Sequence, residues 1–156
     1  MVARFDEVYM RLSNSKWREV MFGAAVVVGL ACGLACGGSG SQGSGDPAVV
    51  GTWVGTAAGS STVWTFTFAS TDAEVKMGTV LAYKGTYVAN ASTNPKGVSF
   101  TITESSYATY IGKTSNGIYK IEGSTLTLAS NQPGDATRPT DFTPGGNAEV
   151  FTLVKQ

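Results

Sequence analysis

The chain has 156 residues, carries eleven basic and eleven acidic residues, and is only 14% charged. Its 42% hydrophobic and 10% aromatic content is typical of a globular protein, and the length allows one folded domain of roughly a hundred residues beyond a targeting segment. From Gly37 onward there are seven basic and eight acidic residues, so the net charge there is 7 − 8 = −1. Without a basic stripe, nucleic acid is excluded as an expected partner.

The residues needed for most catalytic sites are missing from the main part of the sequence. The chain has no histidine, and its cysteines are Cys32 and Cys36. The sequence after Cys36 therefore offers no thiol nucleophile, no imidazole base and no soft metal ligand, and we expect no metal and no cofactor. No two acidic residues are evidently paired for glycoside hydrolysis, and no Ser-x-x-Lys motif follows Cys36. We predict that the protein is not an enzyme.

The N-terminal part has the pattern of an export signal. Arg11, Lys16 and Arg18 precede an uncharged run over residues 20–35 (VMFGAAVVVGLACGLA). A basic segment followed by an apolar segment is the order found in signal peptides. The leader before it is long and carries Asp6, Glu7 and Glu19, and translation from Met10 would leave a more ordinary signal. Two alternatives stay open: cleavage by ordinary signal peptidase, and an uncleaved anchor, for which the run is short and interrupted by glycines.

A tandem tetrapeptide, Gly-Leu-Ala-Cys, ends at Cys32 and again at Cys36. Small residues before a cysteine resemble the lipobox of bacterial lipoproteins. The resemblance implies that the cysteine receives a diacylglyceryl group, that the signal is cut before it, and that the new amino terminus is acylated, so that several acyl chains hold the protein to a membrane. We favour Cys36, because residues 37–45 (GGSGSQGSG) follow it as a flexible tether; Cys32 is the alternative.

The sequence is thus expected to have three parts. Residues 1–35 form the signal segment, residues 36–47 the lipidated cysteine and the tether, and residues 48–156 the folded domain. This organisation predicts a lipid-anchored protein of the bacterial cell envelope, located at the outer membrane, in the periplasm or at the cell surface.

The folded domain is predicted to be all-β, because two-residue alternation rich in Thr, Val and aromatic residues recurs through it. Trp64, Phe66 and Phe68, for example, fall on one face of a strand. One apolar face can be buried in a closed barrel or in a two-sheet sandwich, and periodicity does not choose between them. The expected strands cover residues 49–57, 62–69, 73–77, 79–90, 97–104, 115–121, 124–129 and 149–155.

A long segment separates the last two expected strands. Residues 130–147 (SNQPGDATRPTDFTPGGN) are irregular and rich in Pro and Gly. We predict a crossing loop or a flap here, because connections of this length without secondary structure are uncommon and are usually functional.

Several motifs of the domain resemble a family of small bacterial lipocalin-like domains that are secreted or lipid-anchored. The resemblance implies an up-and-down barrel of about eight strands, and it brings no established activity, ligand or partner. The motifs are Gly51-Thr52-Trp53, Gly85-Thr86-Tyr87, Gly117-Ile118-Tyr119-Lys120-Ile121-Glu122-Gly123, Leu126-Thr127-Leu128, Arg138-Pro139-Thr140-Asp141-Phe142 and Val150-Phe151-Thr152-Leu153-Val154-Lys155.

The same resemblance implies a structural pair at one end of the barrel. Lipocalin-like barrels often lay an arginine over the tryptophan of the first strand, and here those residues are Arg138 and Trp53. A guanidinium on an indole face stabilises by about 0.5–2 kcal/mol.

Two functional hypotheses follow for the domain. In the first, a small apolar or amphipathic ligand sits in the mouth of the barrel, lined by Trp64, Phe66, Phe100 and Tyr119. In the second, the barrel is solid and its loops, above all residues 130–147, contact another envelope component. A cavity of a few hundred cubic ångströms would favour the first, and a packed interior beside a fixed flap the second.

Overall fold

The computed structural model describes residues 45–156, which form eight strands and one short 3-10 helix, η1 (Ala108–Tyr110), between β5 and β6. Every predicted strand is confirmed, with boundaries that differ by at most two residues. The strands are β1 (Gly51–Ala57), β2 (Val63–Phe68), β3 (Asp72–Met77), β4 (Val80–Asn90), β5 (Lys96–Ser105), β6 (Thr114–Glu122), β7 (Thr125–Asn131) and β8 (Ala148–Lys155).

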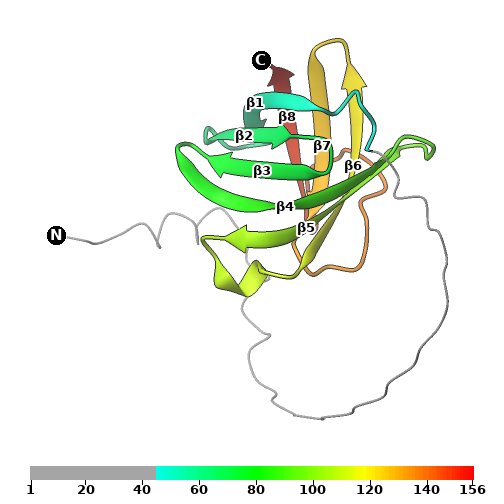
Figure 1. The fold of residues 1–156 in the computed structure, drawn as a ribbon. Coiled ribbons are helices and arrows are strands. Elements are labelled where there is room, and N and C mark those ends of the chain that lie inside the picture. The colour runs from blue at the N-terminus through cyan, green and yellow to red at the C-terminus, as the bar shows by residue number, and fades with distance from the viewer. Residues whose placement is uncertain (1–44) are drawn as a thin grey trace, which may run out of the picture. The chain divides into compact units, whose positions relative to one another are not determined.

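The strands close into an up-and-down antiparallel barrel (Figure 1). Each strand pairs with the next one along the chain, and β1 also pairs with β8, where Val54 lies opposite Val154. Closure leaves no free sheet edge, which an open sheet of the same strands would have. The barrel expected from the resemblance is therefore confirmed over the sandwich.

Two glycines mark places where neighbouring strands approach too closely for a side chain. A Cβ atom at Gly55 would lie 1.9 Å from the carbonyl oxygen of Thr152, and one at Gly85 would lie 1.9 Å from that of Thr101. The pairing of β4 with β5 also shifts register between Lys84 and Gly85. Glycines and register shifts of this kind bend strands around the corners of a barrel.

One end of the barrel is closed by the segment that leads into β1. The backbone turns at Asp46, whose carbonyl oxygen accepts the amide of Val49 at 2.9 Å, and the carbonyl oxygen of Val49 accepts Nε1 of Trp53 at 2.7 Å. Val49 and Trp53 are both buried. The turn therefore covers the core where the chain enters the barrel.

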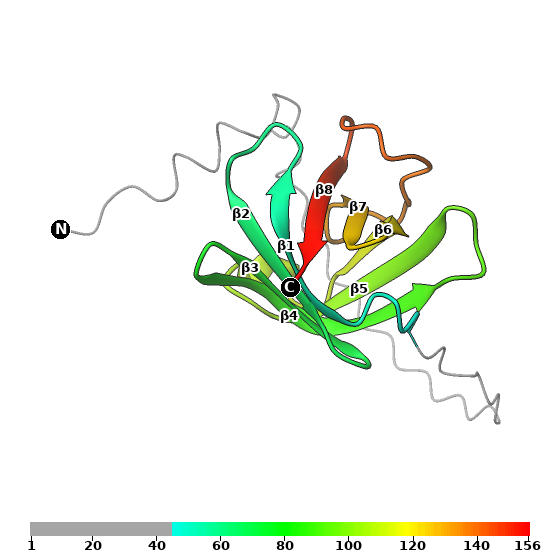
Figure 2. The same ribbon diagram turned by 90° about the horizontal axis from the view of Figure 1, so that it is seen from above.

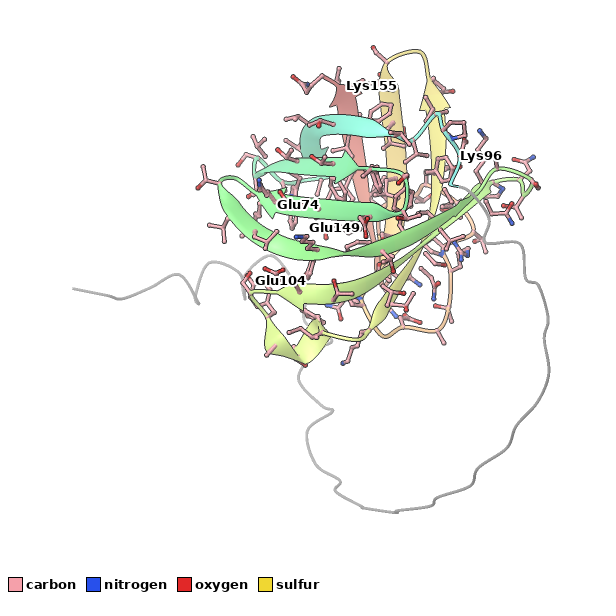
Figure 3. All side chains as sticks on the ribbon, viewed as in Figure 1. Glu74, Lys96, Glu104, Glu149 and Lys155 are labelled. Carbon is pink, nitrogen blue, oxygen red and sulfur yellow. The ribbon has the colours of Figure 1, made fainter. Side chains whose placement is uncertain are left out.

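Asp46 is the polar centre of this closure and is only 8% exposed. Its Oδ1 accepts the amide of Ala48 at 3.0 Å, while its Oδ2 accepts Nζ of Lys96 at 2.8 Å and the hydroxyl of Tyr119 at 2.9 Å. Figure 3 labels Lys96 near the segment that leads into β1. The Asp46 network therefore ties the entering chain to β5 and β6.

Asp46 and Pro47, which the expected boundary at residue 48 assigned to the tether, are among the residues that the structure describes. The glycines and serines of the predicted tether up to residue 44, together with Cys32 and Cys36, lie outside the described residues.

The Asp46 network also shifts the pKa of two of its side chains, Asp46 and Tyr119. The hydrogen bond from Lys96 is the largest effect that holds the pKa of Asp46 below its ordinary value of 3.8, against an opposing effect of burial. Burial, followed by the hydrogen bond to Asp46, raises the pKa of the Tyr119 hydroxyl. Because the carboxyl pKa is lower in the folded state, the ionised Asp46 stabilises the fold above pH 3.8, and this stabilisation is lost as the pH falls through the folded-state pKa.

We predict that Asp46→Ala lowers the free energy of unfolding at pH 7 by about 2 kcal/mol, because it removes hydrogen bonds to a charged group and leaves Tyr119 without its acceptor. Urea titration measures this difference, with Asp72→Ala, an exposed acid of β3, as the control. The gap between wild type and Asp46→Ala should shrink as the pH falls below 3.8. Equal stability at pH 7 would show that the Asp46 network does not hold this end of the barrel.

Candidate functional site

The interior of the barrel is occupied by aromatic rings in edge-to-face contact. The ring of Phe151 lies 5.5 Å from that of Trp64 and 5.1 Å from that of Phe66, with interplanar angles of 75° and 67°. Phe68 meets Tyr87 in the same way at 5.0 Å. Such pairs add about 0.5–1.5 kcal/mol each to the stabilisation from burial.

The four residues expected to line a ligand cavity lie in or against this core. Trp64, Phe66 and Tyr119 are buried, and Phe100 is partly buried against the same cluster. The void that reaches Tyr119 has a volume of about 10 Å³, which is room for one water molecule at most. It is lined by Val49, Phe68, Val98, Tyr119, Leu126 and Leu128.

The connection between β7 and β8, residues 132–147, crosses the outside of the barrel, and we call it the strap. Figure 2 shows this orange segment passing outside β6 and β7. Its Phe142 packs against three buried side chains that face outward from the barrel: Ile118, Ala129 and Val150. Asn131 at the end of β7 donates to the carbonyl oxygen of Thr137 at 3.2 Å and to its hydroxyl at 2.9 Å. The strap is therefore fixed, as expected of a crossing loop.

Arg138 fastens the strap to the outer face of β5 and β6. Its Nη1 donates to the carbonyl oxygens of Val98, at 2.6 Å, and of Gly117, and its Nη2 donates to Oγ of Ser99 at 2.8 Å. Gly97 makes room for the guanidinium, because a Cβ atom there would lie 3.1 Å from Nη1. Arg138 thus links the strap to two neighbouring strands of the barrel wall.

The expected contact between Arg138 and Trp53 was wrong. Trp53 is 1% exposed, and its ring is covered by Lys155, whose Nζ lies 5.1 Å from the ring centroid. The two are cross-strand partners of β1 and β8, and Figure 3 labels Lys155 near the C-terminal end. The physical reason is strand register. The pairing of β1 with β8 puts Lys155 on the same face of the sheet as Trp53, whereas the strap carries Arg138 to the outer face of β5 and β6.

A groove of about 490 Å³ lies between the strap and the β4–β5 hairpin. Arg138, Pro139 and Thr140 form the side contributed by the strap, and Gly97 and Ile118 come from the barrel wall between the two sides. The side contributed by the hairpin consists of Asn90, Thr93, Asn94 and Pro95. The volume of the groove is in the range of about 300–1,000 Å³ that is usual for ligand sites, so the groove is the candidate functional site.

A polar row lies on the inner side of the barrel wall at the end opposite the Asp46 network. The hydroxyls of Ser115 and Ser130 are 2.7 Å apart, and Glu149 is the cross-strand partner of Ser130. Glu149 lies two positions before the inward-facing Phe151 on β8, so the two side chains face the same side of the sheet. The carboxylate of Glu149 has no hydrogen bond or ion pair within residues 45–156. Burial among the surrounding atoms raises the pKa of Glu149.

Residues 45–156 contain no group of three or more His, Cys, Asp or Glu side chains placed to hold a metal ion. In the same part of the chain, no helix is long and apolar enough to cross a membrane.

The closed, eight-stranded antiparallel barrel fits a lipocalin-like fold. Comparisons with protein-family models, with curated proteins and with solved structures find no match to this chain.

We predict that Arg138→Ala costs about 1–2 kcal/mol of stability, because the guanidinium makes three hydrogen bonds that fasten the strap. Lys155→Ala should cost less than about 1 kcal/mol, the usual value of an exposed cation–π contact. Chymotrypsin cleavage after Phe142 should be faster in Arg138→Ala and unchanged in Lys155→Ala. A strap that stays protected in Arg138→Ala would contradict this role of the arginine.

Glu149→Gln is expected to raise the melting temperature at pH 7. Because the folded-state pKa of Glu149 is raised, its ionisation destabilises the fold at neutral pH, and this cost disappears below its ordinary value of 4.5. Thermal unfolding should therefore show wild type and Glu149→Gln diverging as the pH rises from 4 to 7. The matched control is Glu104→Gln, which removes an exposed carboxylate of β5. A variant less stable than wild type at pH 7 would show that the ionised carboxylate is stabilising.

Proposed function

We propose that the chain is a lipid-anchored protein of the bacterial cell envelope and that its barrel is a non-enzymatic binding domain with a solid core. In this proposal, acyl chains on Cys36, or on Cys32, hold the protein to the membrane, and the tether carries the barrel. The barrel then contacts another envelope component through the groove beside the strap. The observation that carries this binding mode is a packed interior beside a fixed strap.

The interior supports recognition from outside. The inward rings of Trp64, Phe66 and Phe151 contact one another at centroid distances between 5.1 and 6.4 Å. A ligand between them would have to displace rings that already stabilise one another. The outer groove needs no such displacement, because its volume is open between the strap and the hairpin.

The anchor is supported by the sequence and by the way the chain enters the barrel. The tandem Gly-Leu-Ala-Cys motif precedes a Gly/Ser run that ends next to Asp46. Because Asp46 is buried and bonded to Lys96 and Tyr119, a tether that continues from it would hold the barrel at one fixed point.

A second candidate is a barrel that takes a small apolar or amphipathic ligand at its mouth. It is supported by the resemblance to lipocalin-like domains and by two inward-facing residues that are not fully buried. These are Phe100, which is partly buried, and Glu149, whose side chain is open to solvent although the protein atoms around it raise its pKa. We place this candidate second, because Trp64, Phe66 and Tyr119 contribute their surface to the packed core.

Native mass spectrometry of the full-length protein, purified from bacterial membranes in gentle detergent, tests the anchor and the cargo together. We expect the mass of residues 36–156 plus acyl chains, and no further mass released on activation. Cys36→Ser should lose the acyl mass and the membrane association, and Cys32→Ser is the matched control.

Each other result has a definite meaning. Acylation that is lost in Cys32→Ser and kept in Cys36→Ser would assign the anchor to the first cysteine. An intact precursor without acyl chains would overturn the lipoprotein proposal. A reproducible small mass released on activation would overturn the solid core in favour of the second candidate.

A further inference from the structure

The groove contains a fixed cation whose charge is not neutralised. The ion pairs of residues 45–156 are Lys76–Glu74, Lys96–Asp46 and Lys120–Glu122, so Arg138 has no carboxylate partner within this region. Among the groove-lining side chains, Arg138 is the one that carries a charge. The groove therefore has a single positive charge, which fits a ligand with a single negative group.

The guanidinium keeps part of its hydrogen-bonding capacity free. Arginine carries five N–H donors. Three of them are used, two on Nη1 for Val98 and Gly117 and one on Nη2 for Ser99. One donor on Nε and one on Nη2 remain without an acceptor in the described part of the chain. Both nitrogens are donors that a carboxylate oxygen can accept from.

The guanidinium is also held in place before any ligand arrives. Gly97 leaves the space in which it lies on the sheet, and the backbone oxygens of two strands fix its Nη1. A preorganised donor loses less side-chain entropy on binding than a mobile surface arginine does.

The rest of the groove is neutral and polar. Asn94 and Thr140 face it from opposite sides, and their side chains make no hydrogen bond with the rest of residues 45–156. Amide and hydroxyl groups both donate and accept, as the hydroxyls of a sugar do. Pro95 and Pro139 add apolar ring surface. None of the described residues that line the groove is aromatic.

We propose that this groove binds a carboxylate-bearing sugar. Arg138 takes the carboxylate through Nε and Nη2, and Asn94 and Thr140 take neighbouring hydroxyls. This inference rests on the proposed function, since it names the chemistry of the component that the outer groove recognises. A single fixed cation fits a monoanionic carboxylate better than a doubly charged phosphate.

The test is calorimetric titration of the full-length protein in detergent with two probes of matched size. A trisaccharide of one galacturonic acid and two galactose residues, which carries a single carboxylate, should bind, and the neutral trisaccharide of galactose should bind at least about tenfold more weakly, which corresponds to about 1.4 kcal/mol. Inorganic phosphate and a short peptide with a free C-terminal carboxylate are titrated alongside them.

Substitutions that leave the protein folded show which residues of the groove bind the sugar. Asn94→Ala and Thr140→Val should each weaken the acidic trisaccharide several-fold at an unchanged melting temperature. Arg138→Lys, which keeps the charge but loses the forked geometry, should weaken it by about tenfold. Lys84→Ala, which removes an exposed cation elsewhere on β4, is the matched control and should bind as wild type does.

Several outcomes would overturn the inference: equal binding of the two trisaccharides, unchanged affinity in both Asn94→Ala and Thr140→Val, or tighter binding of phosphate or of the peptide. Failure here is distinguishable from failure of the proposed function. If the protein is acylated, carries no cargo in the barrel and does not bind the acidic trisaccharide, only the sugar-binding inference is wrong. If cargo is found inside the barrel, the proposed solid core is wrong, whatever the groove binds.

Discussion

The space inside an eight-stranded barrel constrains everything else in this protein. A closed barrel of this size has an interior only just wide enough for side chains, so the residues at inward positions decide whether any room is left. Here those positions carry Trp53, Trp64, Phe66, Phe68 and Phe151, all buried. Large rings fill the interior from several strands at once. Stability and an internal ligand site compete for the same volume, and the inward residues favour stability.

Filling the interior makes the outer wall available for recognition. Strands β6, β7 and β8 each carry an apolar residue that faces outward, and the strap covers these residues with Phe142. Burial of this second, smaller cluster holds the strap down, and the strap in turn forms one side of the groove with Arg138 and Thr140. The groove thus depends on packing that lies outside the barrel.

The sequence predicted the strands and left the contacts between distant residues open. Alternation of apolar and polar residues is a local signal, and it located all eight strands. Closure required the family resemblance as well, because a sandwich satisfies the same alternation. Local patterns carry no information on which charged side chain reaches a given ring, so Arg138 was paired with Trp53 although register puts Lys155 there. The burial of Asp46 was missed for the same reason, since Lys96 lies 50 positions away along the chain.

One signal for the strap was present in the sequence. Ile118 precedes Tyr119, and Val150 precedes Phe151, so these strands carry apolar residues on both faces. Two-sided apolar strands require a cover on the outside as well as a core on the inside.

The position of the strap affects binding at the groove as well as the stability of the fold. If the strap opens part of the time, the apparent affinity of the groove is its intrinsic affinity multiplied by the fraction of molecules in which the strap is closed. A ligand that bridges strap and hairpin stabilises the closed state in return, by an amount set by its concentration relative to its Kd. Packing of Phe142 and recognition at Arg138 are therefore thermodynamically coupled, although the two side chains contact different parts of the wall.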